Sequence, residues 1–348
     1  MLNWTYLPIL KWKQGERIAL SKLTAGQREG MTPILELPPI KSAHDGAALQ
    51  KALPEYLAKI GKDLDKTFDV DQAVGIDIRW VAQGYPKQMR LLAAICKQLA
   101  RQVGCSILPV LNESALETNA EDVSKFGQHQ GYFLRIQTPV VEAAQVLTLV
   151  STAIKNGLRK RNLHIVVDQY SIVKEDAAQK FLAVRPYLDA AIAAGCASVT
   201  VAGGSFPLTL IGFKQGIFDI PRVEWAIWQR IQKEVTYANV RFADYSVTNP
   251  APIVDVDPKQ VNPSVAIRYA VSNQWKLFKA GGFKKGRPNQ YRGLCQLLIT
   301  DPVYSGDKFS YGDDCYDKAA KAKLGNGNPS SWRRDATSHH LALTVAAL

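Results

Sequence analysis

The chain has 348 residues, of which 47% are hydrophobic and 21% are charged, and its formal net charge is +12 at pH 7. This composition is typical of a soluble globular protein. No apolar run approaches the ~20 residues that a bilayer-spanning helix needs, so we expect no transmembrane helix and no membrane partner.

Cysteine usage and the N-terminal sequence both predict a cytoplasmic protein. The segment MLNWTYLPILKWKQ lacks the basic start of a secretory signal, and Pro8, Lys11 and Lys13 interrupt its apolar stretch. The cysteines are scattered, odd in number and form no Cys-x-x-Cys pair, which indicates reduced thiols and argues against a zinc site. They are Cys96, Cys105, Cys196, Cys295 and Cys315.

The excess of basic residues bears on partners and not on fold. It favours an anionic ligand, such as a nucleotide, a nucleic acid or another phosphate-bearing molecule. A generally basic, solvated surface would produce the same charge and has about equal weight.

Eight strand-like runs follow one another along the chain. Most are rich in Ile, Val and Leu and close with polar residues, Pro or Gly, as buried parallel strands do. They are TYLPILKW (5–12), TPILELPP (32–39), VGIDIRW (74–80), CSILPVLN (105–112), GYFLRIQ (131–137), LHIVVDQY (163–170), ASVTVAGG (197–204) and VRFADYSV (240–247).

Segments with helical periodicity connect most of these runs. In residues 85–104, for example, Met89, Leu92, Cys96 and Leu99 fall on one face, and Gly104 is a stop signal. Further helices are expected at 15–23, 44–61, 142–157, 175–195 and 223–235. Strands that alternate with helices predict a (β/α)8, TIM-barrel-like fold. A doubly wound open sheet is the alternative, but no Gly-x-Gly-x-x-Gly turn follows an early strand.

Charged residues recur in the later part of these strands, and in each strand they lie on one of its two faces. In a barrel, the outer strand face packs on helices, while polar residues are tolerated inside near the carboxyl ends of the strands. We therefore expect one set of side chains to point inward. The set is Lys11, Lys13, Glu36, Asp77, Arg79, Arg135, Gln137, Asp168 and Asp244.

The C-terminal part departs from the barrel pattern. Residues 1–300 are assigned to the barrel, with a β-hairpin insertion near 264–285 that turns at Ser272 and Asn273. The segment NQYRGLCQLLI (289–299) is expected to close the barrel as a late helix. Residues 301–348 are expected to form a cap that ends in a helix beginning near Thr337 or Ser338. In an alternative register, AIRYAV (266–271) is the eighth strand and 5–12 is an N-terminal extension.

Several segments carry a family resemblance. YLPILKWKQGERIAL (6–20), with Gly15 and Glu16, is followed by TPILELPP, GIDIRW and the closing SSWRRDATSHHL (330–341). Over nearly the whole chain the sequence resembles the phage-type beta protein family of phages and bacteria. The resemblance implies an intracellular protein encoded by phages or near mobile elements, in phage–host conflict or antiviral defence. It supplies no catalytic residues.

The inward charges form the first candidate site. Carboxylates from separate strands, Glu36, Asp77, Asp168 and Asp244, are candidate catalytic residues and ligands of Mg²⁺ or Mn²⁺. Basic and amide side chains beside them would bind a phosphate group and permit metal-assisted phosphodiester hydrolysis. These are Lys11, Lys13, Arg79, Arg135 and Gln137. A buried network of mutually satisfied ion pairs is the structural alternative.

Two glycine-containing stretches are weaker candidates. In KLFKAGGFKKGRPNQYRG (276–293), basic residues that include Lys284, Lys285 and Arg287 alternate with aromatic ones, as in surfaces that bind single-stranded nucleic acid. In VAGGSFP (201–207), Gly203, Gly204 and Ser205 offer an anion-binding turn. A solvated hairpin tip and an ordinary tight turn explain the same residues.

The sequence thus predicts a protein that binds a phosphate-bearing ligand at the barrel mouth and is a candidate metal-dependent phosphodiesterase. The competing hypothesis is a non-catalytic module that docks nucleic acid or an acidic protein through its basic surface. No Gly-x-Ser-x-Gly, His-Glu-x-x-His or Walker-type motif occurs, so the serine hydrolase, zincin and P-loop NTPase interpretations have little support.

Overall fold

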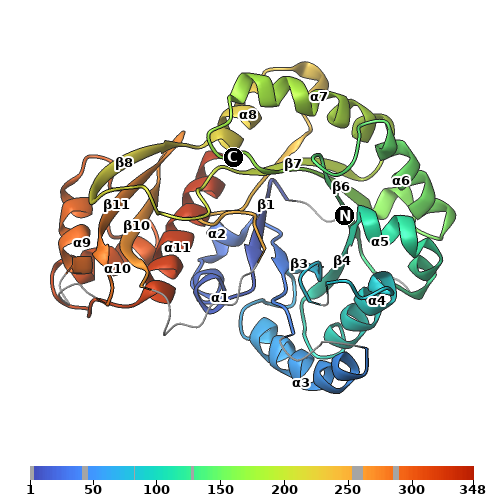
Figure 1. Cartoon of the computed structure of the whole chain (residues 1–348), viewed down its shortest axis with the longest axis horizontal. Coiled ribbons are helices and arrows are strands. Elements are labelled where there is room, and N and C mark those ends of the chain that lie inside the picture. The colour runs from blue at the N-terminus through green and yellow to red at the C-terminus, as the bar shows by residue number, and fades with distance from the viewer. Residues whose placement is uncertain (1–3, 41–45, 82, 127–128, 253–261, 285–289) are drawn as a thin grey trace.

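A computed structural model of the protein describes residues 4–40, 46–81, 83–126, 129–252, 262–284 and 290–348. Eight parallel strands form a closed barrel in the order β1-β2-β3-β4-β5-β6-β7-β9, which confirms the predicted TIM-barrel-like fold (Figure 1). The barrel strands are β1 (Tyr6–Lys11), β2 (Ile34–Glu36), β3 (Ala73–Asp77), β4 (Ser106–Asn112), β5 (Tyr132–Gln137), β6 (Leu163–Ser171), β7 (Ser198–Gly204) and β9 (Arg241–Asp244).

Helices surround the barrel because each buries one apolar stripe against the outer faces of the strands. In α4 (Gln88–Leu99) the predicted stripe of Met89, Leu92, Cys96 and Leu99 is fully buried. The short α5 (Glu113–Thr118) and the 3₁₀ helix η1 (Ala120–Phe126) occupy the connection from β4 to β5, where no helix was predicted. The surrounding helices are α1 (Gln14–Ser21), α2 (Ala25–Arg28), α3 (Gly46–Asp65), α4 (Gln88–Leu99), α5 (Glu113–Thr118), α6 (Gln145–Lys155), α7 (Ala177–Ala193) and α8 (Val223–Ile231).

The barrel interior is stacked in layers that follow the two-residue period of the strands. Trp4 lies at the amino-terminal end, where its ring contacts Phe133 and His164. An aliphatic layer that includes Ile9, Ile34, Val110 and Val166 comes next. Charged side chains occupy the carboxyl-terminal end, which we call the mouth of the barrel.

One predicted inward residue faces the other way. Phe242 packs in the outer core against Tyr6 and Trp225, so Asp244, two residues later, also points outward, toward the helices. Its neighbours Ala243 and Tyr245 belong to the interior cluster instead. The inward assignment of Asp244 was therefore wrong, because the face of β9 was inferred from its charge and not from its aromatic residue.

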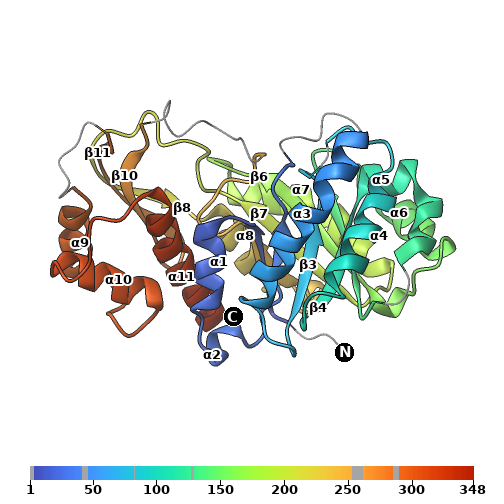
Figure 2. The same cartoon turned by 90° about the horizontal axis from the view of Figure 1, so that it is seen from below.

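A second unit lies beside the barrel (Figure 2). The predicted hairpin is present as β10 (Ser264–Ala270) and β11 (Gln274–Gly282), and a strand that was not predicted, β8 (Gly216–Pro221), pairs with β11. The three-stranded sheet packs on α9 (Gln290–Thr300) and α10 (Tyr311–Ala320) through its own apolar cluster, which contains Phe278, Leu294 and Tyr316. The prediction that residues 289–299 close the barrel is thus incorrect.

The last helix, α11 (Pro329–Ala347), joins the two units. It packs against α1 on one side and against β10 and α10 on the other, so it takes the place in the ring that was predicted for residues 289–299 (Figure 1). It begins eight residues before Thr337, because the Asn328 side chain accepts hydrogen bonds from the backbone N–H groups of Ser330 and Ser331. No helix within the described ranges is long and apolar enough to cross a membrane.

Candidate functional site

Arg135 is the centre of the charged layer at the mouth. Its guanidinium donates to Glu36 Oε1 at 2.9 Å, to Asp77 Oδ2 at 2.8 Å and to Asp168 Oδ2 at 2.9 Å. It also contacts the hydroxyl of Tyr245, which itself donates to Asp168 Oδ2 at 2.5 Å. All five side chains are at most 1% exposed. The structure therefore brings three of the four predicted carboxylates together, around a cation.

Further donors occupy the same carboxylates. Arg79 Nε donates to Asp77 Oδ2 at 2.9 Å, and Trp80 Nε1 donates to Glu36 Oε2 at 3.1 Å. Burial acts to raise the pKa of Asp77, but the Arg79 and Arg135 charges hold that pKa below its ordinary value. These contacts are those of a buried ion-pair network, which was the structural alternative to a catalytic site for these residues.

The carboxylates are not arranged for a metal ion. Oxygen atoms that Mg²⁺ or Mn²⁺ would need already accept hydrogen bonds from guanidinium, indole or phenol groups. Within the residues that the structure describes, no group of three or more His, Cys, Asp or Glu side chains is placed to hold a metal. The fourth predicted ligand, Asp244, lies outside the barrel wall.

Asp244 belongs to a separate buried network. Tyr6 donates its hydroxyl to Asp244 Oδ1 at 2.6 Å, and His340 Nε2 lies 2.7 Å from Oδ2. Arg222 Nη2 lies 3.5 Å from the same carboxylate. Burial raises the pKa of Asp244, but His340 and Arg222 together lower it below its ordinary value. These contacts join β9 to α11, so the role they indicate for Asp244 is to hold the two together.

Three strand aspartates accept the same kind of backbone hydrogen bond. The Oδ1 atoms of Asp77, Asp168 and Asp244 each accept a 2.9 Å hydrogen bond from the backbone N–H two residues later. Two of the donating residues, Tyr170 (φ 60°) and Ser246 (φ 49°), have left-handed backbones. Such conformations are costly outside glycine and concentrate at functional sites. They place backbone strain at the mouth.

A second group of charges lies where the mouth meets the C-terminal unit. Lys11 ends β1 and Lys13 follows it, whereas Arg268 comes from β10 and Arg333 from α11. We call these four residues the seam cluster. Lys11 Nζ donates to the Ala251 carbonyl at 2.5 Å, and Arg268 Nη1 donates to the Val247 carbonyl at 2.8 Å. Both cations thus bind the same loop after β9.

Carboxylates compensate the charge of the seam cluster only in part. Burial, opposed by Glu36 and Glu16 but reinforced by Lys13 and Arg333, lowers the pKa of Lys11 to about 8. Burial and Arg333, opposed by Glu16, lower the pKa of Arg268 to about 9. Arg333 lies 3.9 Å from Glu16. Of the residues that are described, no carboxylate lies within ion-pair distance of Lys11 or Arg268. Arg268 and Arg333 also line a cavity of about 90 Å³.

The other predicted binding residues do not join the mouth. Ser205 is buried beside Glu224 of α8. Gly203 and Gly204 continue β7 as close-packed strand residues, since a Cβ on them would collide with Ile172 and Pro250. They form no anion-binding turn. Lys285 and Arg287 lie outside the described residues.

The basic stretch that begins within β11, at Lys276, is largely engaged in the fold. Lys276 pairs with Asp301 at 3.0 Å, and Lys279 donates to the Phe213 carbonyl at 2.8 Å. Its aromatic residues are also used: Phe278 is in the core of the unit and Tyr291 stacks on Trp332. Lys284 N donates to Asn262 Oδ1. These contacts weaken the interpretation of this stretch as a base-stacking surface.

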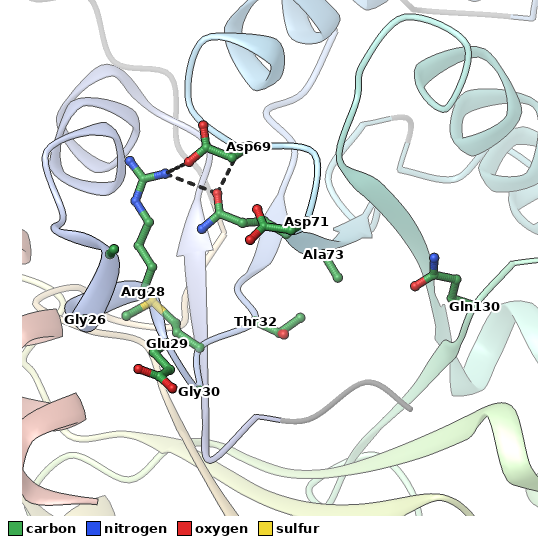
Figure 3. A pocket seen from close by; sticks show the side chains of 12 residues that line it. Gly26, Arg28, Glu29, Gly30, Thr32, Asp69, Asp71, Ala73 and Gln130 are labelled. Carbon is green, nitrogen blue, oxygen red and sulfur yellow. Dashed lines mark hydrogen bonds and ion pairs between the residues drawn. The ribbon is translucent and has the colours of Figure 1, made fainter.

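A wide hollow that the sequence did not indicate opens at the amino-terminal end of the barrel (Figure 3). Its lining includes Glu29, Asp71 and Gln130, and Arg28 bonds Asp69 and Gln72 there. Contacts of this kind hold the loops before β2 and β3 together. The hollow lies opposite the mouth, at the end of a barrel where residues usually serve stability.

The comparisons with known proteins concern family and fold. The sequence matches the family described as Beta protein over residues 6–346. The chain belongs to the Beta protein family. This confirms the resemblance seen in the sequence. A comparison with curated proteins gives no match.

A solved enoyl reductase domain of MlnA, from the macrolactin biosynthesis cluster of Bacillus amyloliquefaciens, is 12% identical to this Beta protein family member. The match covers 99% of this chain and 80% of the other, with a TM-score of 0.38. A likeness at this level carries no functional argument.

Proposed function

We propose that this Beta protein family member binds a phosphate-bearing ligand at the seam cluster. The observation that supports the proposal is that Lys11 is buried and Arg268 partly buried with no carboxylate partner in the described chain. Glu36 and Glu16 act on this pair only from beyond ion-pair distance. Burying cations without a direct counter-charge is unfavourable, so the pair is better explained by an anion that completes it. Their hydrogen-bond partners are neutral carbonyl oxygens, and Arg268 also lies over the Phe206 ring, 4.7 Å from its centroid.

The residue types favour phosphate over a simple carboxylate. Arginine presents a planar set of donors to phosphate oxygens, and lysine adds a compact charge. Arg333 and Lys13 increase the positive potential felt at Lys11 and so would stabilise a multiply charged group. The chain's net charge of +12 would draw anions toward it.

The proposed role is binding and not phosphodiester hydrolysis. The carboxylates that hydrolysis would need, Glu36, Asp77 and Asp168, are all bound to Arg135, which itself is completely buried. The association with phages and mobile elements that the family resemblance implies makes nucleotides and nucleic acids from a phage or its host the first ligands to test, in a defence or counter-defence role.

Calorimetric titration with pyrophosphate tests the proposal. We expect saturable binding by the full chain and a loss of affinity of at least tenfold, or about 1.4 kcal/mol, in both Lys11→Met and Arg268→Met. Lys59→Met, on the exposed face of α3, removes the same charge elsewhere and should bind as the parent does. Equal weakening by all three substitutions would indicate a general effect of net charge and would contradict the proposed site.

A further inference from the structure

Three buried polar atoms at the mouth have no hydrogen-bond partner in the described chain. They are Arg79 Nη2, Glu113 Oε2 and Gln137 Nε2. Their residues follow or end three consecutive strands, β3, β4 and β5, so they come from one side of the mouth. Buried donors and acceptors normally find partners, so a cluster of unsatisfied ones indicates groups that a ligand completes.

The three atoms differ in hydrogen-bonding character. Arg79 and Gln137 offer N–H donors, whereas Glu113 offers a carboxylate oxygen. The Glu113 side chain is 5% exposed, and burial raises its pKa, while the Arg79 and Arg135 charges lower it. A phosphate would be repelled by Glu113. A group that carries both an acceptor and an N–H donor would satisfy all three.

Aromatic side chains lie on the same side of the mouth. Tyr170 and Trp80 are both half-buried, and Trp80 is held by its bond to Glu36. The Arg79, Asp168 and Glu36 charges all act on the Tyr170 hydroxyl, so this side chain lies over the charged layer. Its strained backbone is fixed by Asp168. Both rings offer faces on which a planar base can stack.

The strand register relates this polar group to the seam cluster. Lys11 of β1 is paired with Glu36 of β2, and Glu36 is paired with Asp77 of β3, which binds Arg79. Neighbouring strands lie about 4.8 Å apart, so the Lys11 and Asp77 backbones are separated by roughly 10 Å. The sugar of a nucleotide can connect a phosphate at one position with a base at the other.

From this arrangement we propose that the ligand of the seam cluster is a nucleotide whose base lies against Arg79, Glu113 and Gln137. The base accepts hydrogen bonds from Arg79 and Gln137 and donates one to Glu113, and Tyr170 or Trp80 covers its face. The inference rests on the proposed phosphate-binding role of the seam cluster and adds the chemical class of the ligand.

The experiment compares the four common ribonucleoside triphosphates with tripolyphosphate by calorimetric titration. Tripolyphosphate has the phosphate chain without sugar or base. We expect at least one nucleotide to bind tenfold or more tightly than tripolyphosphate. Glu113→Gln should remove most of that advantage, because a charged acceptor is replaced by a weaker neutral amide oxygen, and should leave tripolyphosphate affinity unchanged. Glu117→Gln, on the exposed side of α5, is the matched control and should change neither affinity.

The outcomes separate the two proposals. Tripolyphosphate that binds as tightly as every nucleotide would overturn the base site and leave the phosphate site standing. Binding of neither probe would overturn both. Unchanged tripolyphosphate affinity also shows that Glu113→Gln is folded, and Gln137→Ala provides a second variant with the same expected result. Equal weakening of both probes by Glu113→Gln and by Gln137→Ala would contradict a base-specific role.

Discussion

Arg135 Nη2 and Asp168 Oδ2 lie 2.9 Å apart at the mouth of the barrel, and both side chains are completely buried. Through the same guanidinium, β5 is joined to β6, β2 and β3. Such a cluster is costly to bury and is tolerated only when its members satisfy one another. The first prediction therefore concerns stability.

Replacing Arg135 by Met should lower the free energy of unfolding by about 3–5 kcal/mol, because three buried carboxylates lose their shared cation. Arg135→Lys should also be strongly destabilising, since an ammonium group lacks the planar set of donors. Urea unfolding measures both changes. Arg161→Met, at an exposed position, should stay within about 0.5 kcal/mol of the parent. A loss below about 1 kcal/mol for Arg135→Met would contradict a structural role for the network.

Asp244→Asn should lower the stability of the fold without changing its affinity for pyrophosphate. The change weakens the acceptor shared by Tyr6 and His340, so we expect a loss of about 1–3 kcal/mol in unfolding free energy. Because Asp244 faces away from the barrel interior, pyrophosphate affinity should not change. Urea unfolding and calorimetric titration of the same variant check this. If Asp244→Asn lost pyrophosphate binding but kept nearly parental stability, Asp244 would have to be part of the phosphate-binding site.

Glu224 should make stability depend on pH. Burial and the Asp244 charge, opposed by Arg222, raise the pKa of Glu224 to about 7 from 4.5. The folded protein therefore retains a proton that the unfolded chain releases. The resulting stabilisation is complete below pH 4.5 and is lost as the pH rises through about 7.

Glu224→Gln should remove this dependence, which urea unfolding at a series of pH values can measure. The difference between parent and variant isolates the contribution of Glu224 from other groups that titrate in the same range. Glu121→Gln, at an exposed position, is the matched control and should follow the parent. Parallel curves for the parent and Glu224→Gln would show that Glu224 does not titrate in this window.

Anion binding should weaken in base because of Lys11. Its pKa of about 8 in the unliganded protein means that the ammonium charge is lost above that pH. Sulfate is a suitable probe because its own charge is constant there. We expect affinity to fall by at most about tenfold per pH unit above pH 8. Lys11→Arg, which stays charged, should lose the fall centred near pH 8 and keep only the later one expected from Arg268, whose pKa is about 9. A fall centred near pH 8 in Lys11→Arg would assign that titration to another group.

Much of the barrel could be predicted because its strands carry a strong local signal. Ile, Val and Leu fill each buried run, and the placement of Glu36, Asp77, Arg135 and Asp168 inside follows from the two-residue period. β9 was harder, because Arg241 and Asp244 put a charge on each face. There the aromatic Phe242 was the better guide to the outer core.

The C-terminal unit could not be predicted to the same extent because its contacts are not local. β8 pairs with β11, more than fifty residues later in the chain, and its own residues are mostly exposed. The α11 sequence lacks an apolar stripe because its polar residues are buried in specific contacts. His339, for example, lies 2.8 Å from Asp313. Only part of the seam cluster was predicted. Lys11 and Lys13 were named as binding residues, whereas Arg268 and Arg333 were missed because they come from the C-terminal unit.

Locating the anion tests the central claim most directly. Crystals of the full chain grown with tungstate, a heavy analogue of phosphate, should give an anomalous peak within hydrogen-bond reach of both Lys11 Nζ and the Arg268 guanidinium. The peak should be absent from Arg268→Met crystals grown in the same way. A parent structure with tungstate bound only at other basic side chains, and none at Lys11 and Arg268, would contradict the seam cluster as the phosphate site.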